Sequence, residues 1–66
     1  MREMFAADVQ RARSIGQRIT EARQAGDSNM ERAFRRRAAA MVEKFGPVAR
    51  REVGAGRREG LRRKRR

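Results

Sequence analysis

Residues 26–47 of the chain read GDSNMERAFRRRAAAMVEKFGP, a stretch with start and stop signals for a helix. Ser28 and Glu31 have the spacing of a capping box, in which both side chains satisfy free backbone N–H groups at a helix N-terminus. Apolar residues follow at steps of four, four, three and four: Met30, Phe34, Ala38, Met41 and Phe45. Gly46-Pro47 ends the pattern, because glycine caps a helix and proline cannot continue it. The stretch predicts a helix over about residues 29–45.

The segment before this stretch follows the same helical period. Its apolar residues recur at steps of four, three, three, four and three: Phe5, Val9, Ala12, Ile15, Ile19 and Ala22. Gly26 ends it, since glycine is favoured just past a helix C-terminus. We predict a helix over about residues 3–25 and a turn at 26–28. So short a turn folds neighbouring helices back on each other, which gives an all-α, antiparallel two-helix hairpin.

The hairpin has a register in which large and small apolar residues face each other. At the open end of the hairpin this register predicts a contact between Phe5 and Val48. It also sets Asp8, the one charged residue on the apolar stripe of the first helix, opposite Lys44. An exposed ion pair contributes only about 0–1 kcal/mol, so this pair bears on register more than on stability.

A DNA-reading helix-turn-helix is the other fold that such a turn allows. Ala22 and Gly26 have the spacing of the small residue and the turn glycine in that motif. The following helix, however, carries Arg32 and Arg35 where the motif buries aliphatic residues. The sequence also lacks a third helix of convincing length to complete the core of such a motif. We therefore favour the hairpin.

The chain changes composition after the hairpin. Residues 47–66 contain nine Lys or Arg and two Glu, for a net charge of +7, whereas residues 1–46 carry +4. Pro47 suits the first position of a helix, so a short third helix over 47–53 is expected. We expect a flexible basic tail beyond this helix, because glycines at 54, 56 and 60 and the repulsion between like charges work against packing. The two predicted parts are a helical hairpin, 1–46, and a short helix with an Arg-rich tail, 47–66.

The apolar content of the chain is small for a stable fold. Of 66 residues 38% are hydrophobic, and many of these are alanines. Small scaffolds usually need disulfides, a metal or a partner for stability. This chain has no Cys for a disulfide, and without Cys or His it lacks the thiolates and imidazoles that bind structural metals. We therefore expect self-association, as a homodimer or in a larger assembly, and no bound metal.

Catalysis has little support in this sequence. The usual general base and thiol nucleophile are missing, and the few hydroxyl side chains have no histidine to activate them. We expect a non-enzymatic protein without cofactor or small-molecule substrate. The chain has no apolar run long enough for a membrane span and no visible signal peptide. The expected location is therefore the cytoplasm, including the nucleoid or ribosome, with no membrane partner.

Arginine is the informative residue of this chain. It carries 19 Lys or Arg, all but two of them Arg, against 8 Asp or Glu, a formal net charge of +11. Clustered guanidinium groups bind phosphates through paired hydrogen bonds and release counterions on binding. We therefore predict a nucleic-acid-binding protein. The predicted contact residues lie on the outer face of the second helix and in the tail: Arg32, Arg35, Arg36, Arg50, Arg51, Arg57, Arg58, Arg62, Arg63, Lys64, Arg65 and Arg66.

The kind of nucleic acid follows from the aromatic residues. The chain has three Phe and no Trp or Tyr, and all three Phe are predicted in the core. Single-stranded targets are usually held by exposed aromatic side chains, so phosphate contacts to structured RNA or duplex DNA fit better. Arginine-rich arms fold on RNA, which favours structured RNA slightly.

A protein-interaction module is the alternative. In this hypothesis the chain is a small adaptor or inhibitor that docks its helical hairpin on a partner with an acidic surface. The apolar face, including Phe5 and Phe45, would supply the contact, and the positive charges would steer the approach.

Overall fold

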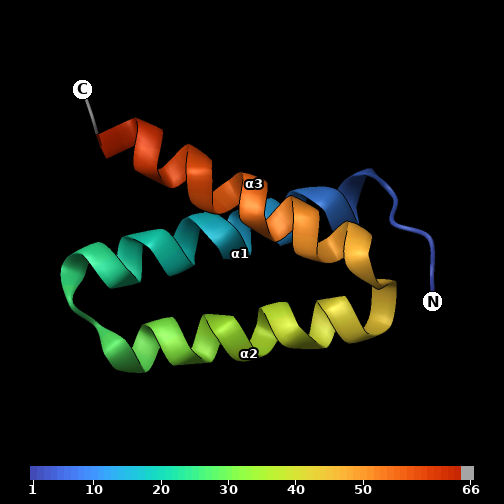
Figure 1. Ribbon diagram of the computed structural model, residues 1–66, viewed down its shortest axis with the longest axis horizontal. Coiled ribbons are helices and arrows are strands. Elements are labelled where there is room, and N and C mark those ends of the chain that lie inside the picture. Colours follow the sequence, from blue (N-terminus) through green and yellow to red (C-terminus); the bar gives the residue numbers. More distant parts are fainter. Residues whose placement is uncertain (65–66) are drawn as a thin grey trace.

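The protein folds into three α-helices in a computed structural model that describes residues 1–64, apart from the side chain of Lys64 (Figure 1). Helix α1 spans Ala6–Ala25, α2 spans Ser28–Phe45 and α3 spans Pro47–Lys64. Helices α1 and α2 run antiparallel. Helix α3 crosses α1 and runs in the same direction as α1 (Figure 1). The all-α prediction is confirmed for the described residues, with a third helix longer than predicted.

The turn between α1 and α2 depends on two residues with different tasks. Gly26 adopts the left-handed conformation, with φ of 73°, and the N–H of Asp27 donates to the carbonyl oxygen of Ala22 at 2.9 Å. The Asp27 carboxylate accepts a hydrogen bond from the N–H of Met30 at 3.0 Å and caps α2. The predicted cap, Ser28, is wrong by one residue, because Ser28 is the first residue of the helix. The carboxylate adds a negative charge at the positive end of the helix dipole.

The N-terminal end of the hairpin departs from the predicted register. The N–H of Phe5 donates to Asp8 Oδ2 at 3.1 Å, so Asp8 serves the start of α1. Within the described part of the chain no ion pair joins Asp8 to Lys44, whose Nζ lies 5.2 Å from the centroid of the Phe45 ring. Phe5 and Val48 are 67% and 47% exposed, so the contact predicted between them is not part of the core.

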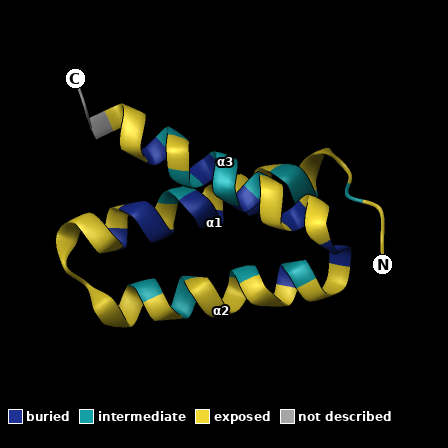
Figure 2. Cartoon of the chain, viewed as in Figure 1, coloured by how far each residue is buried: buried dark blue, intermediate teal, exposed yellow. Residues whose placement is uncertain are grey.

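One core joins all three helices. Its buried residues come from α1 (Ala12, Ile15, Ile19), α2 (Met41, Phe45) and α3 (Ala49, Val53). Figure 2 shows the buried residues on the sides of the helices that face one another. Helix α3 therefore covers apolar surface of the hairpin within a single chain. Self-association stays a prediction.

Helix α3 corrects the prediction of a short helix and a flexible arm. It is 18 residues long and continues through Gly54, Gly56 and Gly60. Each glycine disfavours a helix by about 1 kcal/mol relative to alanine, so contacts with the rest of the fold must stabilise this one. Residues 65–66 of the predicted tail lie outside the described part of the chain.

Those stabilising contacts are close approaches between α1 and α3. A Cβ atom on Gly16 would overlap the carbonyl oxygen of Val53, and a Cβ on Gly56 would overlap the carbonyl oxygen of Arg13. A Cβ on Gly60 would come within 3.0 Å of Thr20 Cβ. Without side chains at these positions the two backbones touch directly and gain dispersion energy along their length. The glycines expected to loosen this segment are the residues that let it dock.

We predict opposite effects for two alanine substitutions in α3. Gly56→Ala should destabilise the fold by about 1–3 kcal/mol, because the added methyl group collides with the Arg13 backbone. Gly54→Ala should stabilise it by up to about 1 kcal/mol through helix propensity. Its new Cβ would meet only the flexible Arg58 side chain, at 3.6 Å. Urea unfolding followed by far-UV circular dichroism measures both, and equal stabilities would contradict the close packing.

The N-cap of α2 gives a second matched pair. Asp27→Ala removes the acceptor of the Met30 N–H and should lower the free energy of unfolding by about 1 kcal/mol. Ser28→Ala should be neutral or slightly stabilising, because alanine is the better helix former. Thermal unfolding of both variants is the measurement. A larger loss at Ser28 than at Asp27 would show that the serine is the cap.

Candidate nucleic-acid interface

The two carboxylates of α3 both face α1. Glu52 Oε1 binds Arg13 Nε at 2.8 Å, and Glu59 Oε2 accepts a hydrogen bond from Gln17 Nε2 at 2.7 Å. The hydrogen bond that Arg13 donates to Glu52, followed by the negative charge of Glu52, raises the pKa of Arg13. Glu52 and Glu59 are seven residues apart and therefore lie on one side of the helix. The opposite side of α3 carries no acid among the described residues.

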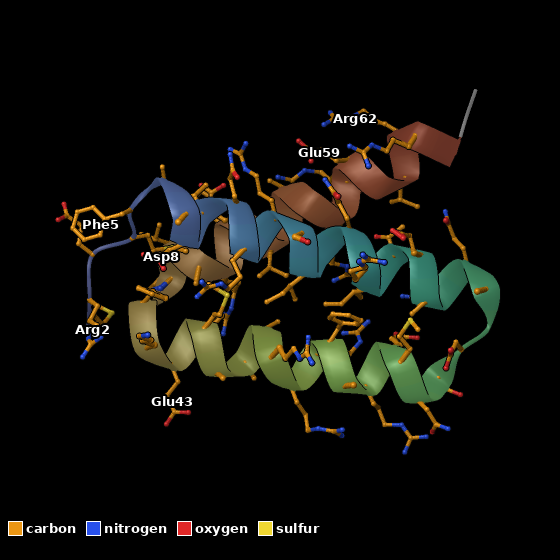
Figure 3. All side chains as sticks on the ribbon, turned by 180° about the vertical axis from the view of Figure 1, so that it is seen from behind. Arg2, Phe5, Asp8, Glu43, Glu59 and Arg62 are labelled. Carbon is orange, nitrogen blue, oxygen red and sulfur yellow. The ribbon has the colours of Figure 1, made fainter. Side chains whose placement is uncertain are left out.

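A line of arginines lies about 100° around the helix from these two acids, on the side of α3 that faces away from the core. Arg51, Arg58 and Arg62, which we call the α3 stripe, are spaced by seven and four residues and are all exposed. Two steps of this size keep the side chains on one face of a helix over about 16 Å. In the described part of the chain the ion pairs involve Arg13, Arg18 and Arg35, and none involves the stripe. Arg62 projects away from the bundle (Figure 3).

The predicted arginine face of α2 is divided by the structure. Arg32 and Arg36 are exposed and share a face with Glu43, from which they are eleven and seven residues distant. Glu43 and Arg62 lie on opposite edges of the molecule (Figure 3), so this face and the α3 stripe do not form one surface. Arg35 lies on a different side of α2 and its Nη2 is 3.0 Å from Glu31 Oε2.

The remaining predicted residues have separate environments. Arg50 and Arg57 line a groove between α2 and α3, and Arg57 is partly buried there. The carbonyl oxygen of Arg57 also accepts a hydrogen bond from Thr20 Oγ1 at 2.9 Å. Arg63 is exposed and follows Glu59 by four residues, on the α1-facing side of the helix. Arg65, Arg66 and the side chain of Lys64 lie outside the described part of the chain.

The sequence predicts arginines as contact residues but does not reveal the pairing of the α3 acids with α1, which leaves the arginines of the stripe facing outward. The α1 residues that hold the acids of α3, Arg13 and Gln17, were not predicted to do so. A signal was present, because Glu52 and Glu59 share a helical side with the small residues at 49, 56 and 60. Reading residues 54–66 as a loose tail removed any reason to look for that side.

Other kinds of site have no support in residues 1–64. No group of acidic side chains there has the arrangement of a metal site. None of the three helices combines the length and apolar character that a membrane crossing requires, over the same residues. Comparisons with protein families, with curated proteins and with solved structures find no match for this chain.

Proposed function

We propose that this chain is a non-enzymatic nucleic-acid-binding protein that contacts the phosphate backbone through the α3 stripe. The observation that supports this most directly is the division of charge on α3. Glu52 and Glu59 are turned toward α1, where Arg13 and Gln17 hold them. The arginines of the stripe are left facing outward. A polyanion that approaches this side meets cations alone.

The ordered helix favours binding further. Arginines on a flexible arm lose conformational freedom when they bind, and a docked helix has already lost most of it. Each guanidinium can donate two parallel hydrogen bonds to a phosphate group. Each phosphate that is neutralised also releases condensed counterions, which makes the affinity depend steeply on salt. Arg32 and Arg36 form a second, smaller basic surface for additional contacts.

The proposed target is structured RNA or duplex DNA, with structured RNA as the first choice. Of the three Phe rings, Phe45 is buried, Phe34 is partly buried with Arg37 5.1 Å from its centroid, and Phe5 is exposed. Phe5 lies at the other end of the molecule from Arg62 (Figure 3). The stripe therefore has no aromatic platform for single-strand stacking. Double-stranded RNA is read mainly through its shape and its phosphates, for which arginines suffice.

The protein-interaction alternative takes a different form in light of the fold. Part of the apolar face first assigned to a partner is covered by α3: Phe45 is only 6% exposed, whereas Phe5 is 67% exposed. An adaptor would therefore have to use a surface that remains open after α3 has docked. The groove between α2 and α3 is such a surface.

Salt-dependent binding tests the proposal. Arg51→Ala/Arg58→Ala removes two stripe arginines seven residues apart and should weaken binding to an RNA hairpin about tenfold or more. The slope of log K against log salt should fall in magnitude by about 1.4–1.8, because about two phosphate contacts are lost. Fluorescence anisotropy between about 50 and 200 mM salt measures both quantities.

A matched variant separates the stripe from overall charge. Arg11 and Arg18 are also exposed, also seven residues apart, and lie on α1. Arg11→Ala/Arg18→Ala therefore changes the net charge equally and should leave most of the affinity and slope intact. Equal losses in the two double variants, or affinity unchanged by salt, would overturn the proposal.

A further inference from the structure

A groove runs between α2 and α3. It has a volume of about 550 Å³, and its apolar lining comes from all three helices: Ile19 of α1, Ala38 and Val42 of α2, and Val53 of α3. The close docking of α3 on α1 accounts for the groove, because the glycines hold α3 against α1 and not against α2. Gly54, which has no side chain, faces this space and keeps it open.

A second hollow, between α1 and α3, adjoins the groove. This hollow has a volume of about 200 Å³ and shares Ile19 and Arg57 with the groove. Leu61, an apolar residue that is 51% exposed, lines it. Together the groove and this hollow, which we call the depression, follow eleven residues of α3 from Arg50 to Leu61, or about 16 Å and three helical turns.

The rim of this depression is basic. Arg50 and Arg57 lie along its α3 side, Arg35 on its α2 side, and Arg23 at its far end. The acidic residue among those that line it is Glu43. Arg35 forms an ion pair with Glu31. Among the described residues no acidic partner lies within 4.0 Å of Arg23, Arg50 or Arg57.

The combination of apolar floor and basic rim selects one class of occupant. A second copy of this chain carries +11 and would be repelled by the rim. A nucleic acid can pair its phosphates with the arginines of the rim. It has no apolar side chains, however, to pack against Val42, Val53 and Leu61. A helix with an apolar stripe flanked by carboxylates satisfies both, and a groove between two helices is a common site for such a helix.

We propose that this depression along α3 binds an acidic amphipathic helix of a partner protein. Apolar residues of the partner, spaced three and four apart, lie on the floor over about three turns. Its Asp or Glu side chains pair with Arg50 and Arg57. This binding is independent of the α3 stripe, because Arg50 and Arg51 are neighbours in sequence but point to different sides of the same helix.

Designed helical peptides test the class of ligand. The probe has Leu at positions i, i+4, i+7 and i+11 with Glu on both flanks, and it is titrated into the isotope-labelled full chain. Two-dimensional NMR should show shifts at the backbone amides of Val42, Val53 and Gly54. One control peptide replaces each Leu with Ser and another replaces each Glu with Lys; neither should shift these amides. Shifts confined to the α3 stripe, or equal binding of a control peptide, would overturn the proposal.

Adjacent charge reversals test the location. Arg50→Glu should weaken the Leu/Glu peptide about tenfold, while Arg51→Glu, with the same change in net charge, should weaken it less than about twofold. In the RNA assay the order should reverse, with Arg51→Glu the more damaging. Equal effects on the peptide, or release of bound peptide by the RNA hairpin, would contradict a separate groove site. If the chain bound the peptide but did not bind the RNA hairpin, the proposed function would be overturned and the proposal for the groove would still hold.

Discussion

The close approach of α3 to α1 at Gly16 and Gly56 is the contact on which the rest of the structure depends. Because the two backbones touch there, an Arg-rich and Gly-rich segment becomes an ordered helix. That helix brings Ala49 and Val53 into a core that the hairpin could not complete alone. The same contact turns the carboxylates of α3 inward, sets its arginines outward, and leaves space on the side of α2.

The hairpin could be predicted from the sequence because its information is local. Apolar spacing and the glycines at 26 and 46 determine where two helices run and where they end, to within about three residues. The third helix could not be found in the same way, because its glycines weaken local helix propensity while allowing a contact some forty residues away in sequence. The small-residue spacing of Ala12 with Gly16, and of Gly56 with Gly60, was the signal for that contact. Propensity alone gave the wrong answer.

For the candidate site, too, the sequence predicts the residue type, whereas the grouping of the residues depends on the fold. Composition alone led to the prediction that arginine is the functional residue type, and that prediction required no structure. Which arginines act together depends on α3, since Arg50 borders a groove while Arg51 faces solvent one position later. Arg35 was predicted to share the outer face of the second helix with Arg32 and Arg36, yet it faces a different side of α2 and pairs with Glu31. A charge count treats all of these residues alike, whereas the fold sorts them into surfaces with different chemistry.

The long sequence separation of the α1–α3 contacts has a consequence for how the molecule opens. Hydrogen bonds between these helices join residues 37 to 42 positions apart, so closing them requires a larger loop than closing the hairpin. Loop closure therefore opposes the docking of α3 more than it opposes the hairpin, and the close contacts between α1 and α3 have to offset that cost. A ligand that binds only the docked helix draws the equilibrium toward the folded chain by mass action. A partner of that kind would also help to hold the third helix in place.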